Sequence, residues 1–196
     1  MLALIMAGGA GSRLGMAEKP LVTIGTRPMI AYVLDAFASA GHETLVVTSP
    51  RTPVTKNWCR ANGIERYDAE GSGYIDDLEE TVLALDLGEP LFTCVADLPC
   101  LNARIIHTIE ERYRTAGTPA CSTWVPHDLC REYGCRTQYT AIVDGVDACP
   151  VGINIVDGTR IGSAQEEVAV LIRDRRLAFN INTREELALV RSYLCR

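Results

Sequence analysis

The chain has 196 residues, of which 47% are hydrophobic and 22% are charged, and its net charge is −6. These proportions are typical of a globular domain that buries a sizeable core. Its Lys and Arg residues form no run and no evident basic face, so we do not expect a nucleic-acid partner. The early apolar run at residues 2–7 is too short to span a membrane and lacks the flanks of a signal peptide, so the expected location is the cytoplasm.

The cysteine and histidine spacings are not those of a typical metal site. No CxxC pair occurs, and the closest two cysteines are Cys130 and Cys135. Because no export signal is present, reduced thiols are the preferred interpretation, and Cys94 is expected in the core. A structural metal is the less favoured alternative, with the candidate ligands Cys121, Cys130, Cys135 and Cys149. The three histidines stand apart from one another and are expected at the surface.

Apolar residues alternate between strand-like and helix-like spacing over the first part of the chain. Strands are expected at residues 2–7, 44–48, 64–67 and 91–96. Helices are expected at residues 29–40, 53–61, 74–85 and 103–115, with Gly41 ending the first and Thr52 capping the second. Strands that alternate with helices predict an α/β fold, with a mostly parallel central sheet and helices on both faces.

The order is less regular beyond residue 118. Strands are expected at residues 121–125, 141–143 and 151–156, with a turn over the DGVDACP segment and irregular structure at 127–140. Thr183 and Glu186 form the Thr-x-x-Glu pattern of a capping box, which predicts a final helix. Because no repeat, low-complexity stretch or linker interrupts the chain, we expect a single domain at residues 1–196.

The first strand enters a glycine-rich segment, LIMAGGAGSRLGMAEKPL, at residues 4–21. Its glycines are spaced G-x-G-x-x-x-G, one residue longer than the dinucleotide-binding pattern, and no carboxylate ends the second strand. The segment also lacks the G-x-x-x-x-G-K-[ST] pattern of a P-loop. It therefore fits neither of these two common phosphate-binding motifs.

A permissive backbone at Gly8, Gly9 and Gly11 can still direct N–H groups at an anion. Arg13 and Lys19 add two cations, and Pro20 fixes the chain after the lysine. This arrangement suits a triphosphate whose terminal phosphates become the leaving group, with Lys19 neutralising charge at the α-phosphate. The alternative is an ordinary strand-to-helix turn that carries two solvated cations.

The segments AGGAGSRLG and EKPL resemble the signature of nucleotidyltransferases that activate sugars, molybdenum cofactor and related small molecules with nucleoside triphosphates. Four further segments, VTSPRTPVTK, GSGYIDDLEE, CPVGINIV and FNINTREEL, are similar to the archaeal-type GTP:adenosylcobinamide-phosphate guanylyltransferases of cobalamin synthesis. The resemblance covers nearly the whole chain. It implies a single Rossmann-like domain, with the nucleotide bound by residues 1–117 and the acceptor by residues 118–196.

The resemblance also implies an activity. GMP is transferred from GTP to adenosylcobinamide phosphate, with Mg²⁺ as the cofactor and pyrophosphate as the second product, and a homodimer is a family-level expectation. Another acceptor, such as molybdopterin or a sugar phosphate, is one alternative. A nucleotide-binding regulator without catalytic activity is a second.

The site residues implied by the resemblance fall into three groups. The catalytic residues are Arg13, Lys19 and Asp97, of which Asp97 also holds the metal. The nucleotide-binding residues are Ala7, Gly8, Gly9, Gly11, Ser49, Thr52, Gly71, Gly73 and Tyr74. The far wall, where the acceptor meets the nucleotide, is formed by Gly152, Asn154, Asn180 and Asn182. The family supplies a further oxygen ligand of the metal late in the chain, and the chain departs from it there, because the candidates Asn180 and Asn182 are neutral amides and not carboxylates.

Two of these expectations also have a reading from the residues themselves. Asp97 ends the most apolar strand, so its carboxylate is expected at the carboxyl edge of the sheet, where ligands bind in open α/β folds. Alternatively, Asp97 is a turn residue or a helix cap. The glycines at 71–73 precede a helix, whose amino end favours negative or carbonyl groups. Within that helix Asp77 matches the family pattern, and its acidic neighbours are expected to be solvated.

Overall fold

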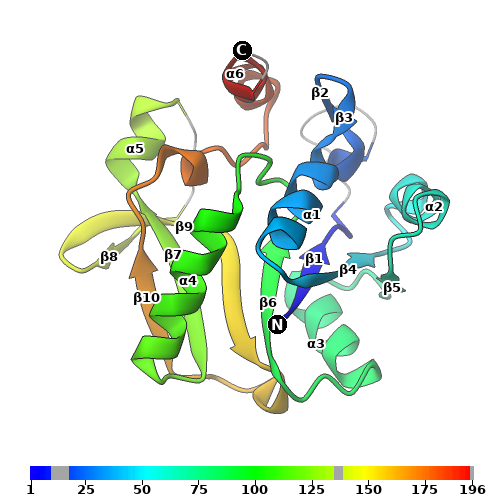
Figure 1. The fold of residues 1–196 in the computed structure, drawn as a ribbon, viewed down its shortest axis with the longest axis horizontal. Helices are drawn as coiled ribbons and strands as arrows, with labels where there is room; N and C mark the ends of the chain where they lie inside the picture. Colours follow the sequence, from blue (N-terminus) through cyan, green and yellow to red (C-terminus); the bar gives the residue numbers. More distant parts are fainter. Residues whose placement is uncertain (10–17, 135–138, 195–196) are drawn as a thin grey trace.

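The computed structural model describes residues 1–9, 18–134 and 139–194, and Figure 1 shows their arrangement around one central sheet. The described strands of this sheet run in the order β10-β7-β9-β6-β1-β4-β5, and β8 pairs with β9 outside that path. Their bounds are β1 Leu2–Met6, β4 Glu43–Thr48, β5 Arg66–Asp68, β6 Pro90–Val95, β7 Ala120–Pro126, β8 Ala141–Val143, β9 Val146–Asp157 and β10 Glu167–Leu171. The sheet continues through both halves of the chain without a break.

Strand β1 lies between β4 and β6 and is parallel to both, and β4 is parallel to β5. Strand β9 is antiparallel to β6 and β7. The predicted α/β fold with a mostly parallel sheet is therefore confirmed. Because the parallel strands end at the same edge, the segments that follow β1, β4 and β6 meet there.

Helices cover both faces of the sheet. Helices α1 (Met29–Ser39), α2 (Pro53–Ala61) and α4 (Ala103–Ala116) share a core cluster with Ala3 and Ile5 of β1. Helix α3 (Tyr74–Ala84) packs on the opposite face, in a cluster that includes Leu4 and Met6. The two faces alternate along β1 because successive side chains of a strand point in opposite directions.

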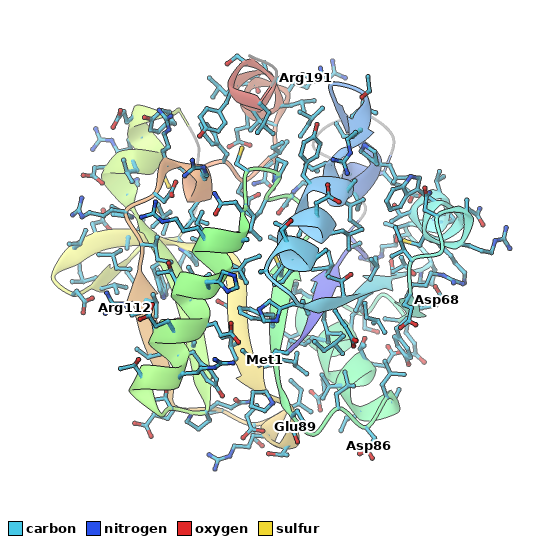
Figure 2. All side chains as sticks on the ribbon, viewed as in Figure 1. Met1, Asp68, Asp86, Glu89, Arg112 and Arg191 are labelled. Carbon is cyan, nitrogen blue, oxygen red and sulfur yellow. The ribbon has the colours of Figure 1, made fainter. Side chains whose placement is uncertain are left out.

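A smaller apolar cluster joins the end of the chain to its beginning. Helix α6 (Arg184–Leu194) packs against β2 (Thr23–Ile24), which follows the short helix η2 (Lys19–Leu21) and forms a hairpin with β3 (Arg27–Pro28). Arg191 of α6 donates a 2.8 Å hydrogen bond to the carbonyl of Thr23, and Figure 2 shows this arginine beside the hairpin. The Lys19 segment and the segment before α6 are thereby held together.

Most of the expected elements are present within one to three residues of their predicted bounds. The capping box of α6 is confirmed, since the Glu186 N–H donates to Thr183 Oγ1 over 3.2 Å and the Thr183 N–H donates to Glu186 Oε2 over 2.9 Å.

Other expectations in the carboxyl-terminal part were wrong. Helix α5 (His127–Glu132) lies within the segment expected to be irregular, and β10 was not expected. The short helices η3 (Gly158–Arg160) and η4 (Arg175–Ala178) complete the fold. Strand β9 already begins at Val146, because the turn after β8 needs only Asp144 and Gly145, both at positive φ. His42 is 8% exposed and buried, contrary to its expected place at the surface.

Four cysteines, Cys59, Cys94, Cys121 and Cys149, are buried with free thiols. Burial raises the pKa of Cys121 to about 12 and that of Cys59 to about 11, so both are protonated near neutrality. The described residues contain no group of three or more His, Cys, Asp or Glu side chains placed to hold a metal, whereas Cys135 lies outside them. No helix among the described residues is long and apolar enough to cross a membrane. The division at residue 117 and the homodimer stay predictions.

Candidate active site

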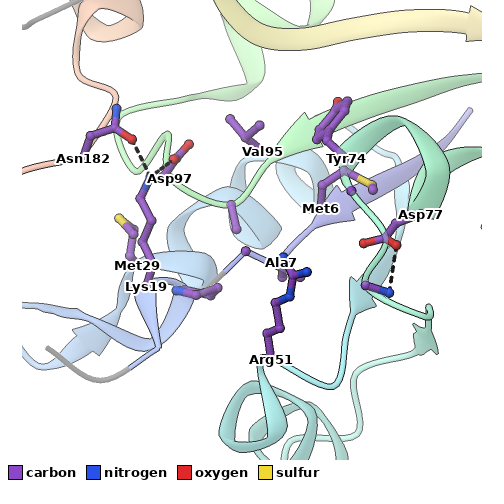
Figure 3. Close-up of a pocket in the computed structure, with 16 residues that line it drawn as sticks. Met6, Ala7, Lys19, Met29, Arg51, Tyr74, Asp77, Val95, Asp97 and Asn182 are labelled. Carbon is purple, nitrogen blue, oxygen red and sulfur yellow. Dashed lines mark hydrogen bonds and ion pairs between the residues drawn. The ribbon is translucent and has the colours of Figure 1, made fainter. Parts of the chain in front are cut away.

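A cavity of about 370 Å³ lies at the carboxyl edge of the sheet (Figure 3). Its floor follows β1 at Met6 and Ala7 and continues into Gly8 and Gly9. The end of β6, the loop before α3, the Lys19 segment and the segment before α6 form its walls. Four segments that are distant in the sequence thus surround one cavity.

Lys19, Asp97 and Asn182 form a polar cluster on one wall. Lys19 Nζ forms an ion pair with Asp97 Oδ2 and donates a 2.9 Å hydrogen bond to Asn182 Oδ1. Asn182 Nδ2 in turn donates to Asn180 Oδ1 over 3.0 Å, which fixes the orientation of the Asn182 amide. The Ile181 N–H also donates to the Asp97 carbonyl over 3.2 Å. The segment before α6 is therefore bound directly to the loop that follows β6.

The neighbour of Lys19 anchors this segment on the other side. Glu18 accepts hydrogen bonds from the N–H groups of Val54 at 2.7 Å and Thr55 at 2.6 Å, in the first turn of α2. A carboxylate at a helix amino end satisfies unpaired N–H groups and interacts favourably with the helix dipole. Thr52 stands at the predicted cap position before Pro53, but its hydroxyl makes no cap hydrogen bond and instead bonds to the backbone of Ser49.

Ser49 joins the two glycine segments that line the cavity. Its Oγ donates a 2.7 Å hydrogen bond to the Gly8 carbonyl and accepts one of 3.1 Å from the Arg51 N–H. A Cβ atom at Gly8 or at Gly71 would lie 3.2 Å from the Cβ of Ser49. Gly71 also has a φ of +82°, a conformation that side chains other than glycine rarely adopt. The close approach favours glycine at both positions, the positive φ strengthens this preference at Gly71, and Ser49 supports the cavity from behind.

Asp77 holds the loop before α3 in place. Its side chain is 5% exposed, and its Oδ1 accepts hydrogen bonds of 2.9 Å from the N–H groups of both Gly71 and Ser72. Asp77 also lines the cavity, and Figure 3 shows its carboxylate beside the loop that it binds. The other acidic residues of this helix were expected to be solvated, and Asp76 is indeed exposed. Glu80 is instead half-buried and accepts a 2.9 Å hydrogen bond from the Tyr67 hydroxyl.

Tyr74 and Arg51 border the cavity from opposite sides. The Tyr74 hydroxyl donates to Thr93 Oγ1 over 3.2 Å, and burial raises the pKa of Tyr74 to about 12. Tyr74 therefore stays neutral at physiological pH. Arg51 reaches toward Ala7 from the segment before α2 (Figure 3), and its guanidinium makes no ion pair with any of the described residues. Arg51 is therefore a cation available to a ligand. It was not predicted from the sequence, although it stands inside the VTSPRTPVTK segment.

Most of the predicted residues that the structure describes meet at this cavity. Those that line it are Ala7, Gly8, Gly9, Lys19, Gly71, Gly73, Tyr74, Asp97 and Asn182. Ser49, Thr52, Gly152, Asn154 and Asn180 are not part of its lining, and Gly11 and Arg13 lie outside the described residues.

Gly152 and Asn154 belong to a bulge in β9. Between the pairs Ser122–Asn154 and Trp124–Pro150, β7 advances by two positions and β9 by four, so the pairing register shifts. Gly152 has a φ of +85°, and a Cβ there would lie 2.9 Å from Cγ2 of Val95, which lines the cavity. Asn154 Oδ1 accepts the N–H of Thr123 over 3.3 Å. The side chain thus substitutes for a backbone acceptor where the ladder is interrupted.

Asp97 has the features of a ligand for a hard cation. Its Oδ1 is buried and has no hydrogen-bond partner among the described residues, while its Oδ2 is paired with Lys19. The cap of α4 is supplied by Asn102, which accepts the Ile105 N–H over 3.0 Å, so Asp97 is not needed as a cap. Mg²⁺ commonly uses one or two carboxylates together with substrate phosphates and water. The single carboxylate oxygen fits such a site, provided that the substrate supplies the remaining oxygens.

Residues 3–146 match the family described as MobA-like NTP transferase domain. The chain belongs to this family. As a member of the MobA-like NTP transferases it is a nucleotidyltransferase, which confirms the predicted enzyme class. It is 33% identical to the adenosylcobinamide-phosphate guanylyltransferase of Methanocaldococcus jannaschii, and the similarity covers 99% of this chain and 97% of that protein.

Two solved structures have the same fold as this MobA-like transferase. A hypothetical transferase from Thermus thermophilus superposes with a TM-score of 0.72 at 14% identity, covering 95% of this chain and 98% of the other. A CMP:2-keto-3-deoxy-manno-octonic acid synthetase complexed with CTP superposes with a TM-score of 0.71 at 15% identity, covering 99% and 97%. At this level of identity the two likenesses support the fold.

Proposed function

We propose that this protein transfers GMP from GTP to adenosylcobinamide phosphate, forming adenosylcobinamide-GDP and pyrophosphate. The full-length similarity to a guanylyltransferase supports the reaction. The observation that carries the proposal is the cluster in which Lys19 joins Asp97 to Asn182 at the wall of a cavity with a glycine-lined floor. This cluster places one amine and one carboxylate where a triphosphate would enter.

In the proposed reaction a phosphate oxygen of the acceptor attacks the α-phosphorus of GTP. The bond from the α-phosphorus to the bridging α–β oxygen breaks, and pyrophosphate leaves with the electron pair of that bond. Direct attack needs no nucleophile from the protein, so positioning and charge neutralisation account for catalysis. The N–H groups of the glycine turn and the Lys19 ammonium supply donors for the negative oxygens of the phosphates.

Asp97 is the residue that would hold Mg²⁺, through its unpartnered Oδ1. When bound, the ion would neutralise negative charge on the triphosphate. Lys19 keeps the other carboxylate oxygen in place, and Asn182 and Asn180 keep Lys19 in place. Arg51 is a second cation that can reach the bound nucleotide from the opposite side.

The test is an incubation of the purified protein with Mg²⁺, adenosylcobinamide phosphate and each of the four common nucleoside triphosphates in turn. We expect pyrophosphate release and a corrinoid product heavier by one GMP with GTP, and far less product with ATP, CTP or UTP. Asp97→Asn is the inactive control. Asp128→Asn is the matched control, because Asp128 lies on α5 at the surface, with its side chain 72% exposed.

Product with molybdopterin or a sugar phosphate, but none with adenosylcobinamide phosphate, would overturn the acceptor that we propose. Tight GTP binding without turnover on any of these acceptors would instead favour a nucleotide-binding regulator.

A further inference from the structure

We propose that Asp77 selects guanine, by accepting hydrogen bonds on Oδ2 from the N1–H and the 2-amino group of the base. This assignment rests on the proposal that the nucleotide is GTP. It concerns the part of the cavity away from Lys19 and Asp97, bordered by Tyr74 and by the loop of Gly71 and Gly73.

The first observation is the unequal use of the two carboxylate oxygens. Oδ1 of Asp77 accepts the N–H groups of Gly71 and Ser72, both at 2.9 Å. Oδ2 has no hydrogen-bond partner among the described residues. Asp77 is 5% exposed, forms no ion pair with the described residues, and stands in the first turn of α3, where the helix dipole favours a carboxylate. Its second oxygen is thus an acceptor that donors of a ligand can reach from the cavity.

The second observation is where Oδ2 lies. A Cβ atom built at Gly8 would be 3.4 Å from Oδ2, so this oxygen faces the glycine floor of the cavity. Asp77 and Gly8 both line that cavity. The absence of a side chain at Gly8 lets this turn approach Asp77 and Ser49 closely, and a ligand reaches Asp77 from the cavity that it lines.

The third observation is chemical. Guanine presents two adjacent donors, N1–H and the 2-amino group, whereas adenine presents the acceptor N1 at the corresponding edge. An acceptor held rigidly by two backbone donors discriminates strongly against an analogue that lacks the matching donors. The phosphates are expected toward Lys19, whose ammonium attracts them.

The variant Asp77→Asn gives a sharp test because its orientation is fixed by the loop. The N–H groups of Gly71 and Ser72 require an acceptor, so the amide oxygen must take the place of Oδ1. The amide nitrogen then replaces Oδ2 and turns an acceptor into a donor. A donor at that point repels the N1–H and 2-amino groups of guanine and matches the 2-carbonyl of xanthine.

We would measure equilibrium binding of GTP, inosine triphosphate, xanthosine triphosphate and 2′-deoxy-GTP, without acceptor. For the unchanged protein we expect inosine triphosphate to bind between about 10-fold and 100-fold more weakly than GTP, the loss expected for one charge-assisted hydrogen bond. For Asp77→Asn we expect GTP to weaken by a similar factor and xanthosine triphosphate to bind more tightly than it does to the unchanged protein. Asp76→Asn is the matched control, since Asp76 is the exposed neighbour and should leave every affinity unchanged.

An equal loss of affinity for all four nucleotides in Asp77→Asn would overturn the assignment, because it would show that Asp77 only supports the loop. Discrimination against 2′-deoxy-GTP that disappears in Asp77→Asn would also overturn it, by placing the ribose on Oδ2. If the variant fails to fold, the unchanged protein still decides: equal affinity for GTP and inosine triphosphate would overturn it. These results are separate from the proposed function, which fails if the unchanged protein does not bind GTP at all.

Discussion

The Nζ atom of Lys19 donates a hydrogen bond of 2.9 Å to Oδ1 of Asn182, which lies 163 residues further along the chain. The same amine is paired with Asp97 at the end of β6. One lysine thus links three segments of the chain at the carboxyl edge of the sheet. Its removal should affect the chemical step more than the binding of the nucleotide.

We expect Lys19→Ala to lower kcat by about 10²-fold to 10³-fold, the range measured when one donor to a developing negative charge is removed. GTP affinity should fall much less, because the glycine turn and Arg51 also contact the nucleotide in our proposal. Steady-state kinetics together with equilibrium GTP binding measure the two effects. Lys56→Ala is the matched control, since Lys56 lies on α2 and pairs with Asp68 at 2.5 Å, away from the cavity. Equal losses of kcat and affinity would show that Lys19 only binds.

Glu18 is expected to position Lys19 by anchoring its segment to α2. Removing a carboxylate that caps a helix typically costs about 1–2 kcal/mol, so Glu18→Ala should lower the free energy of unfolding by this amount. It should also lower kcat while leaving the KM for GTP nearly unchanged. Glu18→Gln retains one acceptor oxygen and should recover part of both losses. If the Glu18→Ala protein is less stable but retains full kcat, Glu18 acts only as a helix cap and does not position Lys19.

Asn154 is expected to matter for stability more than for the acceptor. Asn154→Ala leaves the buried N–H of Thr123 without its partner, which typically costs about 1–3 kcal/mol in the free energy of unfolding. Asn154→Asp keeps the acceptor oxygen and should retain more stability. Urea unfolding and acceptor kinetics of both variants provide the measurement. A normal unfolding curve with a raised acceptor KM would support the far-wall role implied by the family resemblance.

The buried His42 should make stability depend on pH. Burial, followed by the nearby amino terminus at 3.2 Å, lowers the pKa of His42 below its ordinary value of 6.5, against an opposing effect of Glu110. The folded protein therefore binds this proton more weakly than the unfolded chain does. The contribution of neutral His42 to the free energy of unfolding is fully present above about pH 6.5, the ordinary pKa of histidine. It declines as the pH falls below that value toward the lower pKa of His42 in the folded protein.

Thermal unfolding measured between about pH 5 and pH 8 covers the pH range around the ordinary pKa of histidine, where this decline is expected. We expect His42→Gln, which cannot titrate, to show a smaller decline than the unchanged protein. His107→Gln should retain the decline, because His107 is 56% exposed and also faces Glu110. The same decline in His42→Gln as in the unchanged protein would assign the pH dependence to another group.

The regular elements of the first half could be predicted because each follows from a local pattern. The apolar run of β1 and the helical spacing in α3 are visible in short windows of sequence, and so is the capping box of Thr183 and Glu186. Strand β9 was placed too late, because an antiparallel strand with a bulge does not keep a strict alternation of apolar residues. The true cap of α2 could not be predicted either, since Glu18 lies 35 residues before the helix begins.

The sequence by itself determined that a glycine turn follows a buried strand, that Lys19 follows the turn, and that Asp97 comes just after another apolar strand. These features are local, and the family resemblance extended them to a nucleotidyltransferase. Only the tertiary structure decided which groups face one another across the cavity. Asn182 reaches Lys19 because α6 packs on the β2–β3 hairpin, and Asp77 is distinguished from its acidic neighbours by burial against the Gly71 loop. Contacts of this kind depend on packing between distant segments, which no local pattern encodes.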